Sequence, residues 1–124
     1  MATYRELLEQ AKAEIDEVDA AEAMAALNNG DSPLLLDIRE RDEWDEGHLP
    51  DAIHIPRGSL EFKADLSAPS ADKNFALDRP VILHCASGGR AALAGKLLKD
   101  MGYEKVYNLG GLKDWVEAGG KVEK

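Results

Sequence analysis

Short apolar runs alternate along the chain with amphipathic stretches, and this alternation predicts strands and helices in turn. Apolar runs predict strands at residues 15–18, 34–38, 52–55, 81–84 and 105–109. Helical spacing predicts helices at residues 4–13, 20–27 and 91–101, and a last helix that carries Leu112, Trp115 and Val116. Strands that alternate with helices are typical of a parallel sheet covered by helices, so we expect an α/β fold.

The chain has the length of a single domain. Its 124 residues are 44% hydrophobic, which suffices for one core without disulfides or a structural metal. We expect an N-terminal helical arm over residues 1–14 and one domain over residues 15–124. Residues 62–78 are rich in Ser, Pro, Asp and Asn, which predicts a partly helical excursion over the surface. We expect Trp44 and Trp115 to pack in the core.

Acidic residues outnumber basic ones, and the formal net charge is −9. Such a chain repels nucleic-acid phosphates and anionic membrane surfaces, so we expect neither as a partner. The first residues lack the apolar core of a signal peptide, and no apolar run approaches the roughly 20 residues that span a bilayer. The single cysteine excludes an internal disulfide and suits a reducing compartment, which favours the cytoplasm.

The strongest chemical signal follows the strand predicted at residues 81–84. There, Cys85-Ala86-Ser87-Gly88-Gly89-Arg90 leads straight into the helix predicted over residues 91–101. Ligands of open α/β folds bind at the carboxyl ends of strands, and the unpaired amides of such a turn form a nest for an anion. Arg90 adds a positive charge. We therefore predict a reactive, reachable thiolate at Cys85. The simpler interpretation is that a lone cysteine is a small buried core residue.

The three histidines are not expected to take part in this chemistry. Adjacent residues of a strand point to opposite faces of the sheet, so His84 is poorly placed to act as a base for Cys85. We expect His84 to be a core or hydrogen-bonding residue, and His48 and His54 to be structural. The sequence contains no constellation of metal ligands.

The loop and three further motifs resemble those of the rhodanese family. Residues 36–40, Leu-Asp-Ile-Arg-Glu, look like that family's Asp-x-Arg strand end. Residues 43–56, Glu-Trp-Asp-Glu-Gly-His-Leu-Pro-Asp-Ala-Ile-His-Ile-Pro, are similar to its signature of Glu, an aromatic residue, Gly-His, Pro, Ala and Ile-Pro. Gly110, Gly111 and Trp115 resemble its Gly-Gly-x-x-x-Trp element. Four motifs in the right order, over roughly residues 15–120, form a specific signal.

The resemblance implies a single rhodanese-like domain with a central, mostly parallel, five-stranded sheet flanked by helices. It also implies a sulfurtransferase that uses a Cys85 persulfide. Cys85 would take a sulfane sulfur from a small anionic donor such as thiosulfate and pass it to cyanide or a thiol, including a protein thiol. Ping-pong kinetics follow from such covalent catalysis. No metal or organic cofactor is implied.

The residue roles follow from position and charge. The backbone amides of the loop, from Ala86, Ser87, Gly88, Gly89 and Arg90, would cradle the transferred sulfur or the donor. The Arg90 side chain would brace the loop or hold the donor. Ala91 stands where many relatives carry Ser or Thr, so no hydroxyl is present there to bond the thiolate.

Three residues outside the loop are candidates for supporting the site: Asp37, Arg39 and Arg57. Asp37 and Arg39 are expected near the carboxyl edge of the sheet and are more simply interpreted as an ion pair that holds the edge loop. Arg57 follows Pro56 at another strand end and would line the mouth of the site, or else be an ordinary surface arginine.

Two other function classes compete with sulfur transfer. Cysteine-dependent phosphatases and arsenate reductase-like enzymes resemble this arrangement, but the phosphatases place five residues between Cys and Arg. Here four residues separate Cys85 from Arg90, and no second cysteine is present to resolve an arsenate intermediate. The other alternative is a non-catalytic rhodanese-like interaction module. The acidic run 40–46 is most simply interpreted as a solvated face, and the alternative is a docking surface for a basic partner.

Overall fold

A five-stranded sheet forms the centre of the molecule, with the strand order β1–β5–β4–β2–β3 and every pair parallel. The computed structural model describes residues 1–30 and 32–124. The strands are β1 (Asp16–Glu17), β2 (Leu34–Asp37), β3 (Ile53–His54), β4 (Val81–Cys85) and β5 (Val106–Gly111). The predicted α/β fold with a five-stranded parallel sheet is therefore confirmed.

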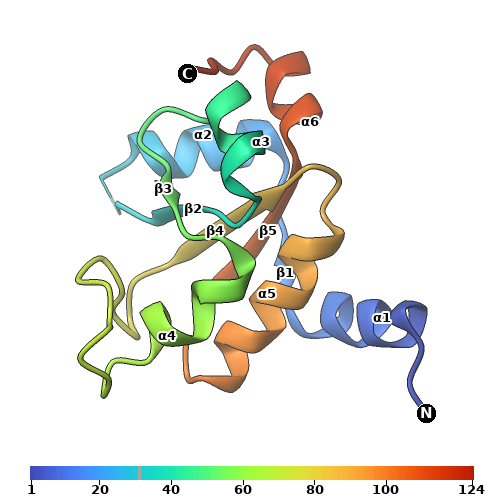
Figure 1. Ribbon diagram of the computed structural model, residues 1–124. Coiled ribbons are helices and arrows are strands. Elements are labelled where there is room, and N and C mark those ends of the chain that lie inside the picture. The colour runs from blue at the N-terminus through green and yellow to red at the C-terminus, as the bar shows by residue number, and fades with distance from the viewer. Residues whose placement is uncertain (31) are drawn as a thin grey trace.

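Helices cover both faces of this sheet. They are α1 (Tyr4–Glu14), α2 (Ala20–Asn28), α3 (Arg41–Glu46), the 3-10 turn η1 (Arg57–Ser59), α4 (Leu60–Ala64), α5 (Gly89–Asp100) and α6 (Leu112–Glu117). Figure 1 shows α2 and α6 on one side of the sheet and α4 and α5 on the other. Among the described residues, no helix is long and apolar enough to cross a membrane.

The alternation of side chains along the strands divides the core into two layers. In β4, Val81, Leu83 and Cys85 pack in the cluster beneath α5, whereas Ile82 packs in the cluster beneath α2 and α6. Neighbouring strand β2 follows the same alternation. Cys85 therefore faces α5, the helix that begins a few residues after it.

The N-terminal helix α1 packs along α5. Ala11 at its centre is fully buried in the cluster beneath α5, and Lys96 of α5 pairs with Glu14 at 3.4 Å. At the other end of α1, the Tyr4 hydroxyl lies beside Gly89, where a Cβ atom would come within 2.6 Å of it. The predicted arm is thus a helix that lies against the helix following the cysteine loop.

The structure differs from several of the sequence predictions. Helix α5 begins at Gly89 and not at Ala91, because the glycine conformation of Gly88 lets the backbone turn earlier. Helix α4 begins before residue 62, and the remainder of 62–78 consists mainly of turns. Trp44 was expected in the core, and this is wrong: it is only half-buried. Its ring stacks on two histidine rings instead, with its centroid 3.6 Å from that of His48 and 4.9 Å from that of His54.

The second tryptophan behaves as predicted. Trp115 is 6% exposed and belongs to the cluster beneath α2 and α6. Its indole N–H donates to the carbonyl of Lys121 at 2.8 Å, which ties the C-terminal tail to α6. A buried indole N–H normally finds such a partner.

Candidate active site

Two backbone amides point at the sulfur of Cys85, which is the last residue of β4. The N–H of Gly88 lies 2.9 Å from Sγ, and the N–H of Ala91 lies 3.4 Å from it. Of the five amides predicted to face the sulfur, Gly88 has this contact, while the second donor, Ala91, lies just outside the predicted set. Paired N–H donors favour a sulfur that carries negative charge over one that is neutral.

The local sequence explains why the chain curls in this way. Gly88 precedes the helix with φ of +97°, a conformation that L side chains rarely adopt. This turn brings the first turn of α5 back over the end of β4, so its amides, which have no partner within the helix, converge on the strand end. The positive end of the 12-residue helix therefore faces the sulfur.

The expectation that the sulfur is reachable from solvent is wrong for this conformation. Cys85 is only 1% exposed and belongs to the core cluster beneath α5. Ala86 and Ser87, which follow it, are exposed. The sulfur thus combines the burial of a core cysteine with polar contacts that an inert core cysteine does not need.

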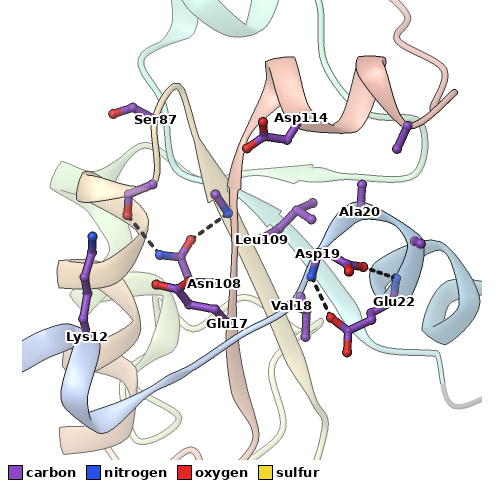
Figure 2. A pocket seen from close by; sticks show the side chains of 14 residues that line it. Lys12, Glu17, Val18, Asp19, Ala20, Glu22, Ser87, Asn108, Leu109 and Asp114 are labelled. Carbon is purple, nitrogen blue, oxygen red and sulfur yellow. Dashed lines mark hydrogen bonds between the residues drawn. The ribbon is translucent and has the colours of Figure 1, made fainter.

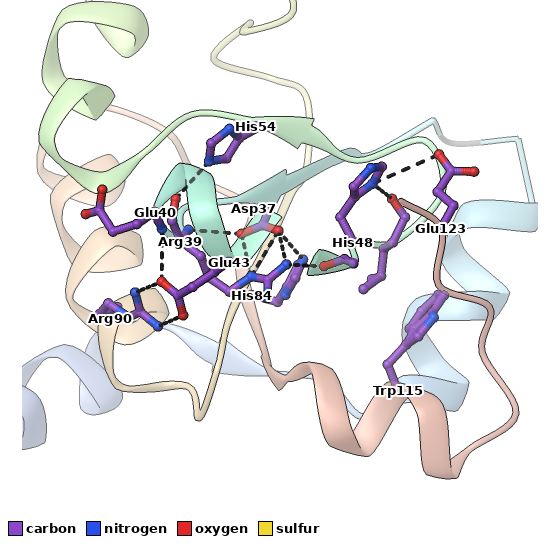
Figure 3. A network of polar contacts seen from close by, with 12 residues as sticks. Asp37, Arg39, Glu40, Glu43, His48, His54, His84, Arg90, Trp115 and Glu123 are labelled. Atoms are coloured by element: carbon purple, nitrogen blue, oxygen red, sulfur yellow. Dashed lines mark hydrogen bonds and ion pairs between the residues drawn. The ribbon is translucent and has the colours of Figure 1, made fainter. Parts of the chain in front are cut away.

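Arg90 points to Glu43 of α3. Its guanidinium makes two hydrogen bonds to the Glu43 carboxylate, at 2.7 and 2.9 Å (Figure 3). This hydrogen bond to Arg90 lowers the pKa of Glu43 to about 2, and the pairing raises the pKa of Arg90. Of the two roles predicted for Arg90, this geometry is that of a brace between α5 and α3.

Asp37 and Arg39 form a buried ion pair at the end of β2. Arg39 Nη2 lies 2.8 Å from Asp37 Oδ2 and 2.7 Å from the carbonyl oxygen of Gly47, and both side chains are almost fully buried (Figure 3). Burial alone would raise the pKa of Asp37, but the hydrogen bonds from Arg39 and the charges of His84 and Arg39 together outweigh it, so the pKa is lowered. The pair fixes the strand end to the loop after α3. Arg57 instead pairs with Glu61 at 2.9 Å, one helical turn away.

Among the described residues, the hydrogen bonds to the Cys85 sulfur come from backbone amides and not from a histidine. His84 is fully buried, and its Nε2 lies 3.5 Å from Oδ2 of Asp37, its partner residue on β2. Among the described residues, neither ring nitrogen has a partner with hydrogen-bond geometry. Burial lowers its pKa and so favours the neutral ring. His54 Nε2 contacts the carbonyl oxygen of Arg39 at 2.8 Å. The described residues contain no group of three or more side chains suited to a metal ion.

Sequence reasoning missed two residues that hold the loop. Glu43 was seen only as part of a motif, and its partner Arg90 lies 47 positions away. Asn108 of β5 is 5% exposed and donates from Nδ2 to the carbonyl of Gly88 at 3.0 Å. No periodicity marks either contact, although a polar residue within an apolar strand was a usable signal for Asn108.

A pocket of about 730 Å³ lies behind the loop, between β5 and the start of α2 (Figure 2). Ser87, Gly88 and Asn108 form its wall on the loop side. The lining also includes four acidic residues and one lysine, which are Glu17, Asp19, Glu22, Asp114 and Lys12. An acidic lining disfavours an anion, so this pocket is a poor route for an anionic donor.

Comparison with known proteins agrees with the fold. The family model described as Rhodanese-like domain matches residues 19–118. A thiosulfate:glutathione sulfurtransferase from Saccharomyces cerevisiae is 32% identical over 97 residues, which cover 70% of this chain and 67% of the yeast protein.

Two further similarities concern chain length and structure. A Bacillus subtilis protein provisionally named a sulfur carrier protein is 29% identical over 110 residues, or 88% of this chain, which spans 54% of that protein's length. A solved structure from Rhodopseudomonas palustris, titled a protein of unknown function and possible tyrosine phosphatase, superimposes with a TM-score of 0.90. It is 34% identical, and the match covers 99% of this chain and 96% of that one.

Proposed function

The chain belongs to the rhodanese-like family, and from this premise we propose that it is a sulfurtransferase whose sulfur carrier is Cys85. The observation that carries the proposal is the pair of amides, from Gly88 and Ala91, aimed at Sγ at 2.9 and 3.4 Å. These donors would stabilise a thiolate before attack and a persulfide after it. The sulfurtransferase relative from yeast supports the same reaction class.

The reaction consists of two displacements. The Cys85 thiolate attacks the outer sulfur of thiosulfate, the sulfur–sulfur bond of the donor breaks, and sulfite leaves with the electron pair. Cyanide or a thiolate then attacks the terminal sulfur of the persulfide, and Cys85 leaves as the thiolate. Neither step needs a metal or an organic cofactor, and ping-pong kinetics are expected.

Access to the sulfur is proposed to come from the exposed side of the loop. Cys85 is 1% exposed, whereas Ala86 and Ser87 are exposed. A local opening of this segment would let a donor sulfur enter between the amides while the bulk of the donor stays outside. The free thiol that this chemistry needs persists in a reducing compartment, for which we propose the cytoplasm.

The residues around the loop are proposed to support it without touching the sulfur. Arg90 braces α5 against α3 through Glu43. Asp37 and Arg39 hold the neighbouring strand end. Arg57, paired with Glu61, is the weakest candidate for site support, because its charge is already matched within its own helical turn.

The decisive experiment is intact-protein mass spectrometry after incubation with thiosulfate. Wild type is expected to gain the mass of one sulfur atom and to lose it on addition of cyanide, with thiocyanate released. Cys85→Ser is expected to gain nothing, while Ser87→Ala, an exposed change in the same loop, is expected to load. A wild-type protein that gains no sulfur, or a Cys85→Ser variant that does, overturns the proposal.

A phosphatase is the second candidate, because the Rhodopseudomonas palustris structure bears that title. Two features argue against it here. Four residues separate Cys85 from Arg90, which leaves a tighter ring than the family's phosphatases use. The Arg90 guanidinium is also occupied by Glu43. Hydrolysis of an aryl phosphate, lost in Cys85→Ser and without any sulfur adduct on wild type, would favour the phosphatase. A non-catalytic module would do neither.

A further inference from the structure

Asn108 connects strand β5 to the cysteine loop through both ends of its side-chain amide. Nδ2 donates to the carbonyl oxygen of Gly88 at 3.0 Å, and Oδ1 accepts the N–H of Gly110 at 2.8 Å (Figure 2). The side chain is 5% exposed. A buried amide whose two ends are both bonded holds its partners in a defined arrangement, because breaking either bond leaves a buried polar group unpaired.

A bulge in β5 places this side chain beside the loop. Leu83 of β4 is opposite Asn108, but the next residue, His84, is opposite Gly110, so Leu109 is an extra residue in β5. Gly110 adopts φ of +91° at this point, and Asn108 Oδ1 accepts its N–H. Bulges often redirect a side chain next to a functional site. Here the bulge and Asn108 stabilise each other.

The partner of Asn108 is the residue whose N–H approaches the sulfur most closely. The Gly88 N–H lies 2.9 Å from Cys85 Sγ, and the Gly88 carbonyl accepts from Asn108 and from the Ala92 N–H at 2.9 Å. A glycine backbone rotates more freely than any other, so its amide keeps one direction only when neighbours fix it. The Ala92 bond comes from the same helix, whereas the Asn108 bond comes from the sheet.

We propose that Asn108 is a positioning residue for the Cys85 sulfur: it anchors Gly88 to β5 so that the Gly88 N–H stays directed at Sγ. This inference rests on the proposed role of Cys85 as the nucleophile and adds a residue that the loop motif does not contain. Loss of the anchor lets Gly88 rotate, and the sulfur then loses one of the two donors that favour its charged form.

The test is the rate at which iodoacetamide alkylates Cys85, measured across pH on wild type, Asn108→Leu and Asn108→Ala. The limiting rate at high pH reports how easily the reagent reaches the sulfur. The pH of half-maximal rate reports how well the loop stabilises the charged sulfur. In both variants we expect the rate–pH profile to move to higher pH, because the sulfur loses one charge-assisted hydrogen bond. The alkylation rate near neutral pH, divided by the limiting rate, should then fall by about tenfold. Urea unfolding checks that each variant is folded, and the comparison uses the Asn108 variant that still unfolds cooperatively.

Tyr103→Phe is the matched control. It removes a single buried hydrogen bond, from Tyr103 Oη to the carbonyl of Ala64 at 2.7 Å, beyond the end of α5 that lies away from the loop. Its profile is expected to coincide with that of wild type. Folded Asn108 variants whose half-maximal pH equals that of wild type overturn the proposal, even if their limiting rate changes. Because alkylation requires no sulfur transfer, a shifted profile in a protein that takes no sulfur from thiosulfate would reject the proposed function and retain this one.

Discussion

The guanidinium of Arg90 and the carboxylate of Glu43 face each other in two hydrogen bonds, at 2.7 and 2.9 Å, that join α5 to α3. The pair closes one side of the cysteine loop with residues that lie 47 positions apart in the chain. Oε1 of Glu43, which accepts one of the Arg90 bonds, also accepts the N–H of Glu40 at 3.0 Å. One acidic and one basic side chain, which belong to separate motifs of the sequence, thus act together as one brace.

Glu43→Gln is expected to lower the free energy of unfolding at neutral pH by about 1 kcal/mol, because a partly exposed pair contributes little even with good geometry. The pKa of Glu43 falls from 4.5 in the unfolded chain to about 2 in the folded one. A lowered pKa stabilises the fold above the unfolded value and ceases to do so as pH falls through the folded value. The difference between wild type and variant should therefore be complete above pH 4.5 and vanish near pH 2. Urea unfolding at several pH values measures it, and a difference that grows on acidification would contradict this account.

Ala11→Leu is expected to destabilise the protein, because Ala11 is fully buried where α1 packs on α5. A larger side chain at such a contact costs about 1–3 kcal/mol. Ala13→Leu makes the same change at an exposed position of the same helix and should be nearly neutral. Urea unfolding of both variants shows whether the N-terminal arm is part of the folding unit. Equal stability of the two would mean that α1 is only loosely attached.

The sequence predicted the position of the cysteine better than its surroundings. An apolar run from Val81, a glycine-containing turn and a helix together place Cys85 at the carboxyl edge of the sheet, because each of these signals is local. The side-chain contacts that hold the loop are not local. Asn108 reaches Gly88 from another strand, and it does so through a bulge that no pattern of apolar residues announces.

The environment of Trp44 shows the same limit. A tryptophan in a motif is reasonably expected in the core, since its large ring gains much from burial. Here the chain stacks the rings of His48 and His54 on the Trp44 ring, and stacking replaces burial in the core. His54 lies on β3 and His48 in the loop before it. Their approach to Trp44 depends on the path of that loop, which the sequence leaves open.

Gly111→Ala is expected to slow the loading of sulfur from thiosulfate by at least about tenfold, the effect of a small displacement of reacting groups. Gly111 is the residue of β5 opposite Cys85, and a Cβ atom there would collide with the backbone carbonyl of Ala86. Backbone cannot move aside as a flexible side chain can, so the loop must shift. The loading rate by mass spectrometry measures the effect. Gly58→Ala, where a Cβ meets nothing within 4 Å, should load like wild type, and equal rates in the two variants would contradict the prediction.

His84 is expected to make stability depend on pH just below neutrality. Burial lowers its pKa below the value of 6.5 for the unfolded chain. The folded protein therefore holds this ring neutral in a range where the unfolded chain already binds a proton. His84 therefore leaves the free energy of unfolding unchanged above pH 6.5 and lowers it as pH falls below that value. The decline is at most about 1.4 kcal/mol per pH unit for one group. The charged and titratable groups that act on it are Asp37, Arg39 and His48.

Urea unfolding of wild type and His84→Asn between about pH 7.5 and about pH 5 isolates this contribution, since every other group titrates in both proteins. Asp37 does not interfere, because its pKa is lowered from 3.8 and its own contribution is lost only at more acidic pH. Wild type should lose stability over this interval more steeply than the variant, whatever the difference between them at pH 7.5. Parallel curves would mean that the folded protein binds a proton at His84 as readily as the unfolded chain does. The interpretation of His84 as a neutral ring beside Asp37 in the folded protein would then be wrong.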